Sequence, residues 1–222
     1  DTMMYLEWPS SFSSNGEYGL YLFEDDIYLL DILNQNYRRI TDTEFEEKAA
    51  RFSPDGGKIS FVRDSDIYVY DLRTKREKRM TFNGSETNLN GTLSWVYWEE
   101  IFGRQDVGYW WSDDSKALAF LNTDESQVTK MHYVHWKPAE PELITQRYPK
   151  AGTKNPEVKL GIIELENLKL KWVDLGPYEY LCRVKWLPGS ERLSVQTMNR
   201  AQTELDLFFV DRASGKNVKK IL

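Results

Sequence analysis

The chain repeats its own sequence at an offset of 40 residues, and this repeat limits the folds it can adopt more than any other feature. FSSNG at residues 12–16 returns as FSPDG at residues 52–56, and DIYLLD at residues 26–31 returns as DIYVYD at residues 66–71. Apolar and polar positions alternate with a period of two in these segments, which indicates strands. Solenoids built from helices have similar repeat lengths but require a 3.6-residue period, so the pattern argues against them.

Each repeat unit predicts one four-stranded blade of a β-propeller. The Ser-Pro-Asp-Gly turn, or its degenerate copy, is expected to join the first two strands as a hairpin. The third strand should end at Asp31 or Asp71, and residues 38–41 or 78–82 should form the outer fourth strand. Short strands that recur about every 40 residues between such turns are typical of propeller blades. The predicted fold class is therefore all-β.

Two further copies of the first half of the unit extend the pattern to about four blades. They are WSDDSKALAF at residues 111–120 and WLPGSERLSV at residues 186–195, and strand-like segments follow both. We therefore interpret the whole of residues 1–222 as a partial propeller. The expected blades lie near residues 1–45, 46–90, 106–175 and 176–222.

Two inserts interrupt the regular spacing, at residues 91–105 and 124–153. Inserts on a repeat scaffold form loops on one face, where binding usually resides. The first insert sets Glu99 and Glu100 among the large apolar and aromatic side chains of residues 95–102. Two carboxylates beside an apolar wall repel each other unless a cation lies between them, so the pair is suited to a positively charged group such as a free amine.

Composition narrows the classes of site and partner. The formal net charge of −6 argues weakly against a nucleic-acid partner or an anionic membrane surface. Cys182 is the only cysteine, which excludes internal disulfides and cysteine-rich metal sites. The only histidines, His132 and His135, would point to opposite faces of a strand, so we expect no metal site. No cofactor is expected either.

Three blocks of the sequence resemble the propeller domain of the dipeptidyl peptidase IV family of serine peptidases. They are WVYWEEIF at residues 95–102, WWS at residues 110–112 and YPKAGTKNP at residues 148–156. The resemblance implies half of an eight-bladed propeller, stacked in the parent protein on a C-terminal α/β-hydrolase domain that this chain lacks. It also implies that the parent is a bacterial dipeptidyl or prolyl tripeptidyl peptidase. Because no Gly-x-Ser-x-Gly string is present, we expect no catalytic residue and no activity in this chain alone.

The same resemblance implies a role for the acidic pair. In the family, the matching glutamates lie on a short helical insert and bind the free N-terminal amine of the substrate. This role transfers to Glu99 and Glu100, with Tyr97 and Trp98 as the pocket wall. An ammonium offers three N–H donors, which two carboxylates can accept. Two extended residues span roughly 7 Å, so an amine held at a set distance from the serine leads to release of dipeptides, or of tripeptides if the distance is longer. Preference for Pro or Ala before the cut would reside in the absent domain.

Two departures from the family pattern leave parts of the site open. Trp98 stands where some relatives carry a third acidic residue, which makes this site less negative and more enclosed. Residues 43–50 contain no arginine to hold the substrate's backbone carbonyl, and Lys48 is only a weak substitute. Carbonyl anchoring is therefore unassigned.

Two alternative interpretations of the acidic pair and of the chain remain open. Glu99 and Glu100 could form a solvated pair on an exposed helical turn, and the chain could be a non-enzymatic propeller that binds peptides or proteins.

The resemblance also implies partners and a location. Besides peptides with a free N-terminus and the hydrolase domain, a second copy of the protein is expected, because residues 124–153 resemble the arm through which family members contact a second subunit. The bacterial relatives suggest the periplasm or the cell envelope, although the N-terminus shows no signal-peptide pattern. Four blades alone leave two sheets without a neighbour, so we expect either an open arc or the pairing of two chains, and the sequence does not choose between them.

Overall fold

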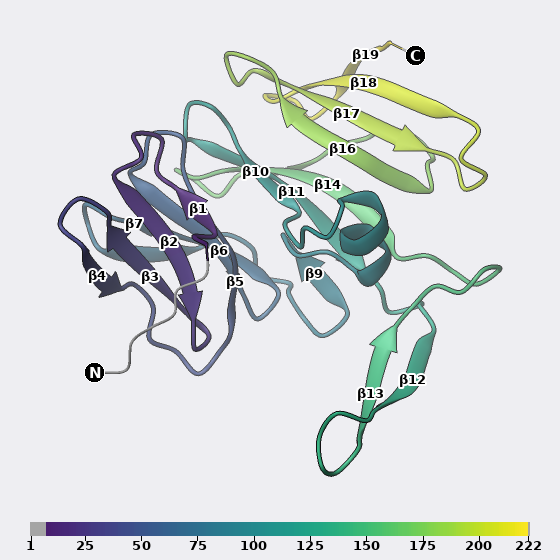
Figure 1. Ribbon diagram of the computed structural model, residues 1–222. Coiled ribbons are helices and arrows are strands. Elements are labelled where there is room, and N and C mark those ends of the chain that lie inside the picture. The colour runs from purple at the N-terminus through teal and green to yellow at the C-terminus, as the bar shows by residue number, and fades with distance from the viewer. Residues whose placement is uncertain (1–7, 222) are drawn as a thin grey trace.

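The computed structural model describes residues 8–221, and antiparallel strands make up almost all of its regular structure (Figure 1). Blade 1 contains β1 (Ser11–Phe12), β2 (Tyr18–Phe23), β3 (Asp26–Asp31) and β4 (Asn36–Arg39). Blade 2 contains β5 (Glu47–Phe52), β6 (Lys58–Arg63), β7 (Asp66–Asp71) and β8 (Arg76–Arg79). In both blades the strands pair in chain order, as propeller blades do.

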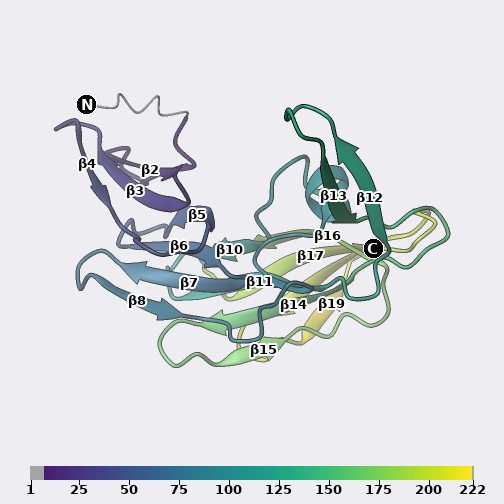
Figure 2. The same cartoon turned by 90° about the horizontal axis from the view of Figure 1, so that it is seen from below.

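The other two blades have the same strand order with additions. Blade 3 contains β10 (Tyr109–Trp111), β11 (Ala117–Asp124), β14 (Glu157–Glu164) and β15 (Leu170–Trp172). A fifth strand, β9 (Asn88–Asn90), pairs with the end of β11. Blade 4 contains β16 (Tyr180–Trp186), β17 (Arg192–Met198), β18 (Leu205–Asp211) and β19 (Asn217–Lys220). The predicted all-β partial propeller is confirmed, and Figure 2 shows its blades along an open arc.

The core lies between the blades. The interface of blades 1 and 2 buries Leu20, Ile27, Leu29, Ala50, Phe52, Ile59 and Phe61. The interface of blades 2 and 3 buries Val62, Ile67, Val69, Met80, Tyr109, Leu118, Phe120 and Ile163. Strand β11 shows why the period of two is needed, because Leu118 and Phe120 face blade 2 while Leu121 belongs to the cluster shared with blade 4. A strand between two blades is therefore buried on both faces.

The repeated arginine and threonine residues hold each outer strand against the third strand. In blade 2, Thr81 Oγ1 accepts a hydrogen bond from Ile67 N at 2.9 Å, and Arg79 is paired with Asp66. Blade 1 repeats these bonds with its own threonine, Thr41, at the same distance from Ile27 N. The outer strands lie earlier in the chain than the predicted ranges 38–41 and 78–82, since they end at Arg39 and Arg79. The strand pairing stops before each threonine because the threonine hydroxyl, and not a backbone carbonyl, accepts the next N–H.

The turns explain why the later copies of the repeat are degenerate. In blade 2, Gly56 has a φ of +71°, a conformation that suits glycine. The matching residue of blade 3 is Ser115, also at positive φ (58°), and its hydroxyl accepts a hydrogen bond from Asp55 N at 3.0 Å. Ser190 does the same for Asp114 N at 3.1 Å. A strained serine thus links each of these turns to the turn of the preceding blade.

The second insert forms an arm that projects from blade 3 (Figure 1). Its strands are β12 (Lys130–His135) and β13 (Glu142–Arg147), which pair only with each other. Within residues 8–221, no helix has the length and apolar character needed to cross a bilayer.

Candidate functional site

The first insert contains a single helical segment, η1 (Val96–Ile101), as the sequence predicts. It is a π-helix, a type that is rare and frequently found at functional sites. Phe102 N donates to Tyr97 O at 2.8 Å, the i to i−5 bond of this helix type. Both candidate glutamates lie on this segment, so its attachment to the blades decides where their carboxylates sit.

Tyr97 holds the insert to blade 4. Its side chain is fully buried, and its hydroxyl accepts a hydrogen bond from Leu181 N at 3.1 Å. Burial raises the pKa of this phenol far above its usual range, so it remains protonated. The prediction of Tyr97 as a pocket wall needs correction, because an inaccessible side chain belongs to the core shared by blades 3 and 4.

Arg183 fastens the other end of the insert. Its Nη1 donates to Ile101 O at 2.8 Å and to Cys182 O at 2.6 Å, and its guanidinium lies 5.6 Å from the centre of the Phe102 ring. The helix carbonyl that would otherwise lack a partner is thereby satisfied. Sequence reasoning missed Arg183, since nothing local marks a residue 82 positions away from its partner.

An aromatic cluster joins the insert to the base of the arm. The Trp95 ring lies 4.7 Å from the Tyr148 ring, centre to centre, and 6.2 Å from the Trp98 ring. Trp98 is half-buried and packs against the core of blades 3 and 4. Of the two predicted wall residues, Trp98 is therefore the one that offers aromatic surface beside the glutamates. Figure 2 shows the insert helix next to the arm.

The two carboxylates are in different environments. Glu99 has 21% of its side chain exposed. Its Oε1 accepts a hydrogen bond from Arg104 Nε at 3.0 Å and makes an ion-pair contact with Arg104 Nη2, also at 3.0 Å. Glu100 is exposed. Consecutive helical residues point roughly a quarter of a turn apart, so the pair fans outward from the helix. Arg104, a residue that the sequence did not single out, provides the nearby cation that two adjacent anions require.

A cleft of about 370 Å³ lies where residues 43–50 approach the ends of the first insert. Lys48 and Asp106 both line it, and Lys48 Nζ pairs with Glu46 Oε2 at 2.8 Å. Asp106 accepts a hydrogen bond from Leu93 N at 2.6 Å, although burial raises the pKa of its carboxyl. The lysine considered as a carbonyl anchor thus lies near the insert, already engaged by a glutamate.

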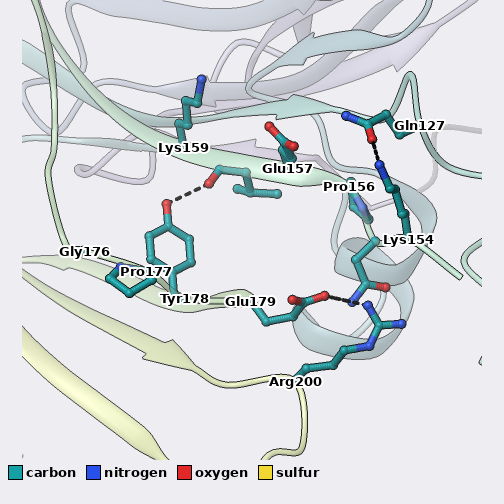
Figure 3. Close-up of a pocket in the computed structure, with 12 residues that line it drawn as sticks. Gln127, Lys154, Pro156, Glu157, Lys159, Gly176, Pro177, Tyr178, Glu179 and Arg200 are labelled. Atoms are coloured by element: carbon teal, nitrogen blue, oxygen red, sulfur yellow. Dashed lines mark hydrogen bonds and ion pairs between the residues drawn. The ribbon is translucent and has the colours of Figure 1, made fainter. Parts of the chain in front are cut away.

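A second cleft, of about 440 Å³, separates blades 3 and 4 (Figure 3). The last residues of the YPKAGTKNP block line it, and Asn155 Nδ2 donates to Glu179 Oε1 at 2.7 Å and to Tyr180 OH at 3.0 Å. Arg200 pairs with Glu179 at 2.9 Å, as Figure 3 shows. The bonds from Asn155 tie the two blades together. Neither Glu99 nor Glu100 lines this cleft.

The histidines of the arm show no arrangement for a metal ion. His132 Nδ1 lies 2.9 Å from Thr145 Oγ1 across the β12–β13 pair. Throughout the described part of the chain, residues 8–221, no three His, Cys, Asp or Glu side chains gather in a way that could hold an ion.

Comparison with known proteins points to one family. A family model described as the dipeptidyl peptidase IV N-terminal region matches residues 13–221. Dipeptidyl peptidase 4 of Felis catus is 32% identical over 206 residues, which cover 84% of this chain and 27% of that protein. Dipeptidyl aminopeptidase B of Saccharomyces cerevisiae is 32% identical over 176 residues, which cover 75% of this chain and 21% of that protein.

Solved structures agree with the sequence comparison. The crystal structure of Porphyromonas gingivalis dipeptidyl peptidase 4 superimposes with a TM-score of 0.82 at 29% identity, and the match covers 95% of this chain and 32% of that one. The chain thus spans about a quarter of the length of the curated relatives it matches.

Proposed function

The chain belongs to the dipeptidyl peptidase IV family, and we propose that it is the part of a serine exopeptidase that admits peptides and holds their free N-terminal amine. The chemistry would take place in an α/β-hydrolase domain outside residues 1–222. The observation that carries the proposal is the short π-helix at Val96–Ile101, which presents Glu99 and Glu100 from a propeller of this family.

The free oxygens of the pair support amine binding. Arg104 occupies only Oε1 of Glu99, and the hydrogen bonds among residues 8–221 leave Glu99 Oε2 and both oxygens of Glu100 without a donor. A protonated amine has three N–H donors and would make charge-assisted bonds to these oxygens. Trp98 would cover one side of the bound amine and reduce its contact with water.

Anchoring the amine fixes how many residues of the peptide lie between its N-terminus and the bond that is cut. Because an extended residue spans at most about 3.6 Å, a serine at a set distance from Glu99 and Glu100 would cut after the second residue, or after the third if that distance is longer. A peptide with a blocked N-terminus would leave the carboxylates desolvated without a partner cation, which costs several kcal/mol. Preference for Pro or Ala before the cut would come from a pocket in the hydrolase domain.

The arm supports a second subunit as a partner. Its strands and tip expose Tyr133, Trp136 and Leu143, with 48%, 75% and 69% of their surface accessible. Large apolar side chains exposed on a projecting hairpin favour its use as an interaction surface. We propose that the arm contacts a second copy of the whole protein, and that this protein functions in a bacterial periplasm or cell envelope.

Substitution of each glutamate in the whole protein tests the amine anchor. Glu99→Gln and Glu100→Gln keep the side-chain volume but remove the charge, so each should lower kcat/KM for a free-amine Ala-Pro reporter at least tenfold, or about 1.4 kcal/mol. Glu191→Gln, at an exposed turn of blade 4, is the matched control and should leave kcat/KM unchanged. Wild-type kinetics in both insert variants would refute the proposal. A whole protein with no peptidase activity would instead favour a non-enzymatic binding module.

A further inference from the structure

The backbone conformation of the insert brings Arg104 to Glu99. Gly103 and Arg104 both have positive φ, 63° and 65°, and Arg104 N donates to Trp98 O at 2.7 Å. A non-glycine residue at positive φ is uncommon, so this conformation is maintained by the local structure. These two left-handed residues turn the chain back along the π-helix. The Arg104 side chain consequently meets Glu99, five positions earlier in the sequence.

Arg104 is bound to the glutamate but still accessible. Its side chain is 78% exposed, and its one hydrogen bond to Glu99, donated by Nε, ends on Oε1, the same oxygen that Nη2 approaches at 3.0 Å. A guanidinium has five N–H donors, and Glu99 takes only the one on Nε, so the donors on both Nη atoms stay available. A ligand whose amine binds Glu99 Oε2 and Glu100 would therefore have this cation close to its first side chain.

The charges on the insert determine which charge a bound peptide can have next to its amine. Glu99, Glu100 and Arg104 together have a net charge of −1, which matches one protonated amine. A basic side chain next to that amine would bring a second positive charge close to Arg104 and be repelled. An acidic side chain in the same place would accept bonds from the free guanidinium donors.

We propose that Arg104 is a specificity-determining residue, which favours peptides with an acidic first side chain and disfavours those with a basic one. This inference rests on the amine anchor proposed above. The role is electrostatic, so it extends to any cation at this position and weakens as salt screens the charges, with a screening length of about 8 Å at 0.15 M.

A reporter panel on the whole protein tests the inference. Asp-Pro, Ala-Pro and Lys-Pro reporters with one leaving group should give kcat/KM in that order for the wild type. Arg104→Gln should raise the Lys-Pro to Asp-Pro ratio about tenfold, mainly through KM, because the guanidinium acts on binding. Arg104→Lys keeps the positive charge and should retain most of the wild-type ratio. A higher salt concentration should move the wild-type ratio toward that of Arg104→Gln.

The outcomes separate this inference from the proposed function. If Glu99→Gln weakens all three reporters while Arg104→Gln leaves the ratio unchanged, the amine anchor stands and the role of Arg104 is refuted. An equal shift of the ratio in Arg104→Gln and Arg104→Lys would also refute it, since charge would not be the cause. If neither glutamate substitution changes kcat/KM, the anchor fails and the inference fails with it.

Discussion

Asp66 of blade 2 and Glu99 of the insert are both carboxylates paired with an arginine, yet their surroundings differ completely. Asp66 is fully buried and accepts hydrogen bonds from Arg79, from Thr81 Oγ1 at 2.5 Å and from Asn90 Nδ2 at 3.0 Å, while the backbone N–H of Gly84 lies 3.2 Å away. Glu99 is partly exposed, and its one partner, Arg104, bonds a single oxygen.

The difference shows what leaves a carboxylate free to bind a ligand. A carboxylate has about four lone-pair positions, and Asp66 fills them from its own blade, so it can only stabilise the fold. Glu99 keeps its second carboxylate oxygen free beside an exposed cation. The same two types of residue, a carboxylate and an arginine, therefore form a buried structural ion pair in blade 2 and a candidate ligand site on the insert.

The strongest test of this contrast is Asp66→Asn. The amide has one acceptor oxygen where the carboxylate had two, and it turns an NH2 group toward buried donors, so we expect a loss of about 3 kcal/mol in the free energy of unfolding. Asp26→Asn in blade 1 is the matched control. Asp26 Oδ1 has no donor, so that substitution should cost less. Urea unfolding of the whole protein measures both, and equal losses would show that the number of donors is unimportant.

Glu47 should make stability depend on pH. Burial outweighs the bond from Arg63 and raises the pKa of Glu47 to about 7. Between its ordinary value of 4.5 and about 7, the folded state holds a proton that the unfolded state has released, so stability falls as the pH rises through this range and then levels off. At about 1.4 kcal/mol for each pKa unit, the expected loss is about 3 kcal/mol.

Unfolding of the whole protein at pH 5, 6, 7 and 8 measures this slope. Burial also raises the pKa of Glu125 to about 7, so the contribution of Glu47 is the difference between the wild type and Glu47→Gln. A slope that Glu47→Gln leaves intact would contradict the prediction.

Tyr97→Phe should loosen the insert without altering either glutamate. Removal of the hydroxyl leaves the buried Leu181 N–H without its acceptor, at a cost of about 1.5 kcal/mol. Tyr133→Phe removes a hydroxyl from the exposed arm and should cost almost nothing. Thermal unfolding compares the two variants. KM for a free-amine reporter should rise in Tyr97→Phe alone, and unchanged stability would show that the bond to Leu181 does not hold the insert.

The smallest expected effect is that of Arg104→Gln on stability. An exposed ion pair contributes between 0 and about 1 kcal/mol, so we expect a change within about 0.5 kcal/mol in urea unfolding. The variant should differ from wild type in substrate selection instead. A loss of unfolding free energy as large as that of Asp66→Asn would show that the Arg104 ion pair stabilises the fold, and the contrast between the two regions would disappear.

Much of the fold follows from local sequence, and the exceptions have physical causes. The repeated turns and the third strands ending at Asp31 and Asp71 were predictable, because turn chemistry and period-two alternation act over a few residues. The outer strands were misplaced because a threonine hydroxyl replaced a backbone acceptor. Strand β9 was not foreseen, since its partner in β11 lies more than 30 residues away.

The candidate site was predictable in composition but not in arrangement. An aromatic and acidic string indicates a short helix with Glu99 and Glu100, yet it does not say which aromatic faces the core. Tyr97 became a core residue because Leu181 N, 84 positions away, is its partner. Arg183 had no local signal for the same reason.

By itself, the sequence determined the number of blades, the inserts and the presence of an acidic pair, because repeats, turns and helix patterns depend on neighbouring residues. Only the tertiary structure decided that Arg104 pairs with Glu99 and that blade 4 holds the insert through Tyr97 and Arg183. These contacts depend on a left-handed turn and on residues brought together from distant positions by packing. Such contacts leave no periodic pattern in the chain.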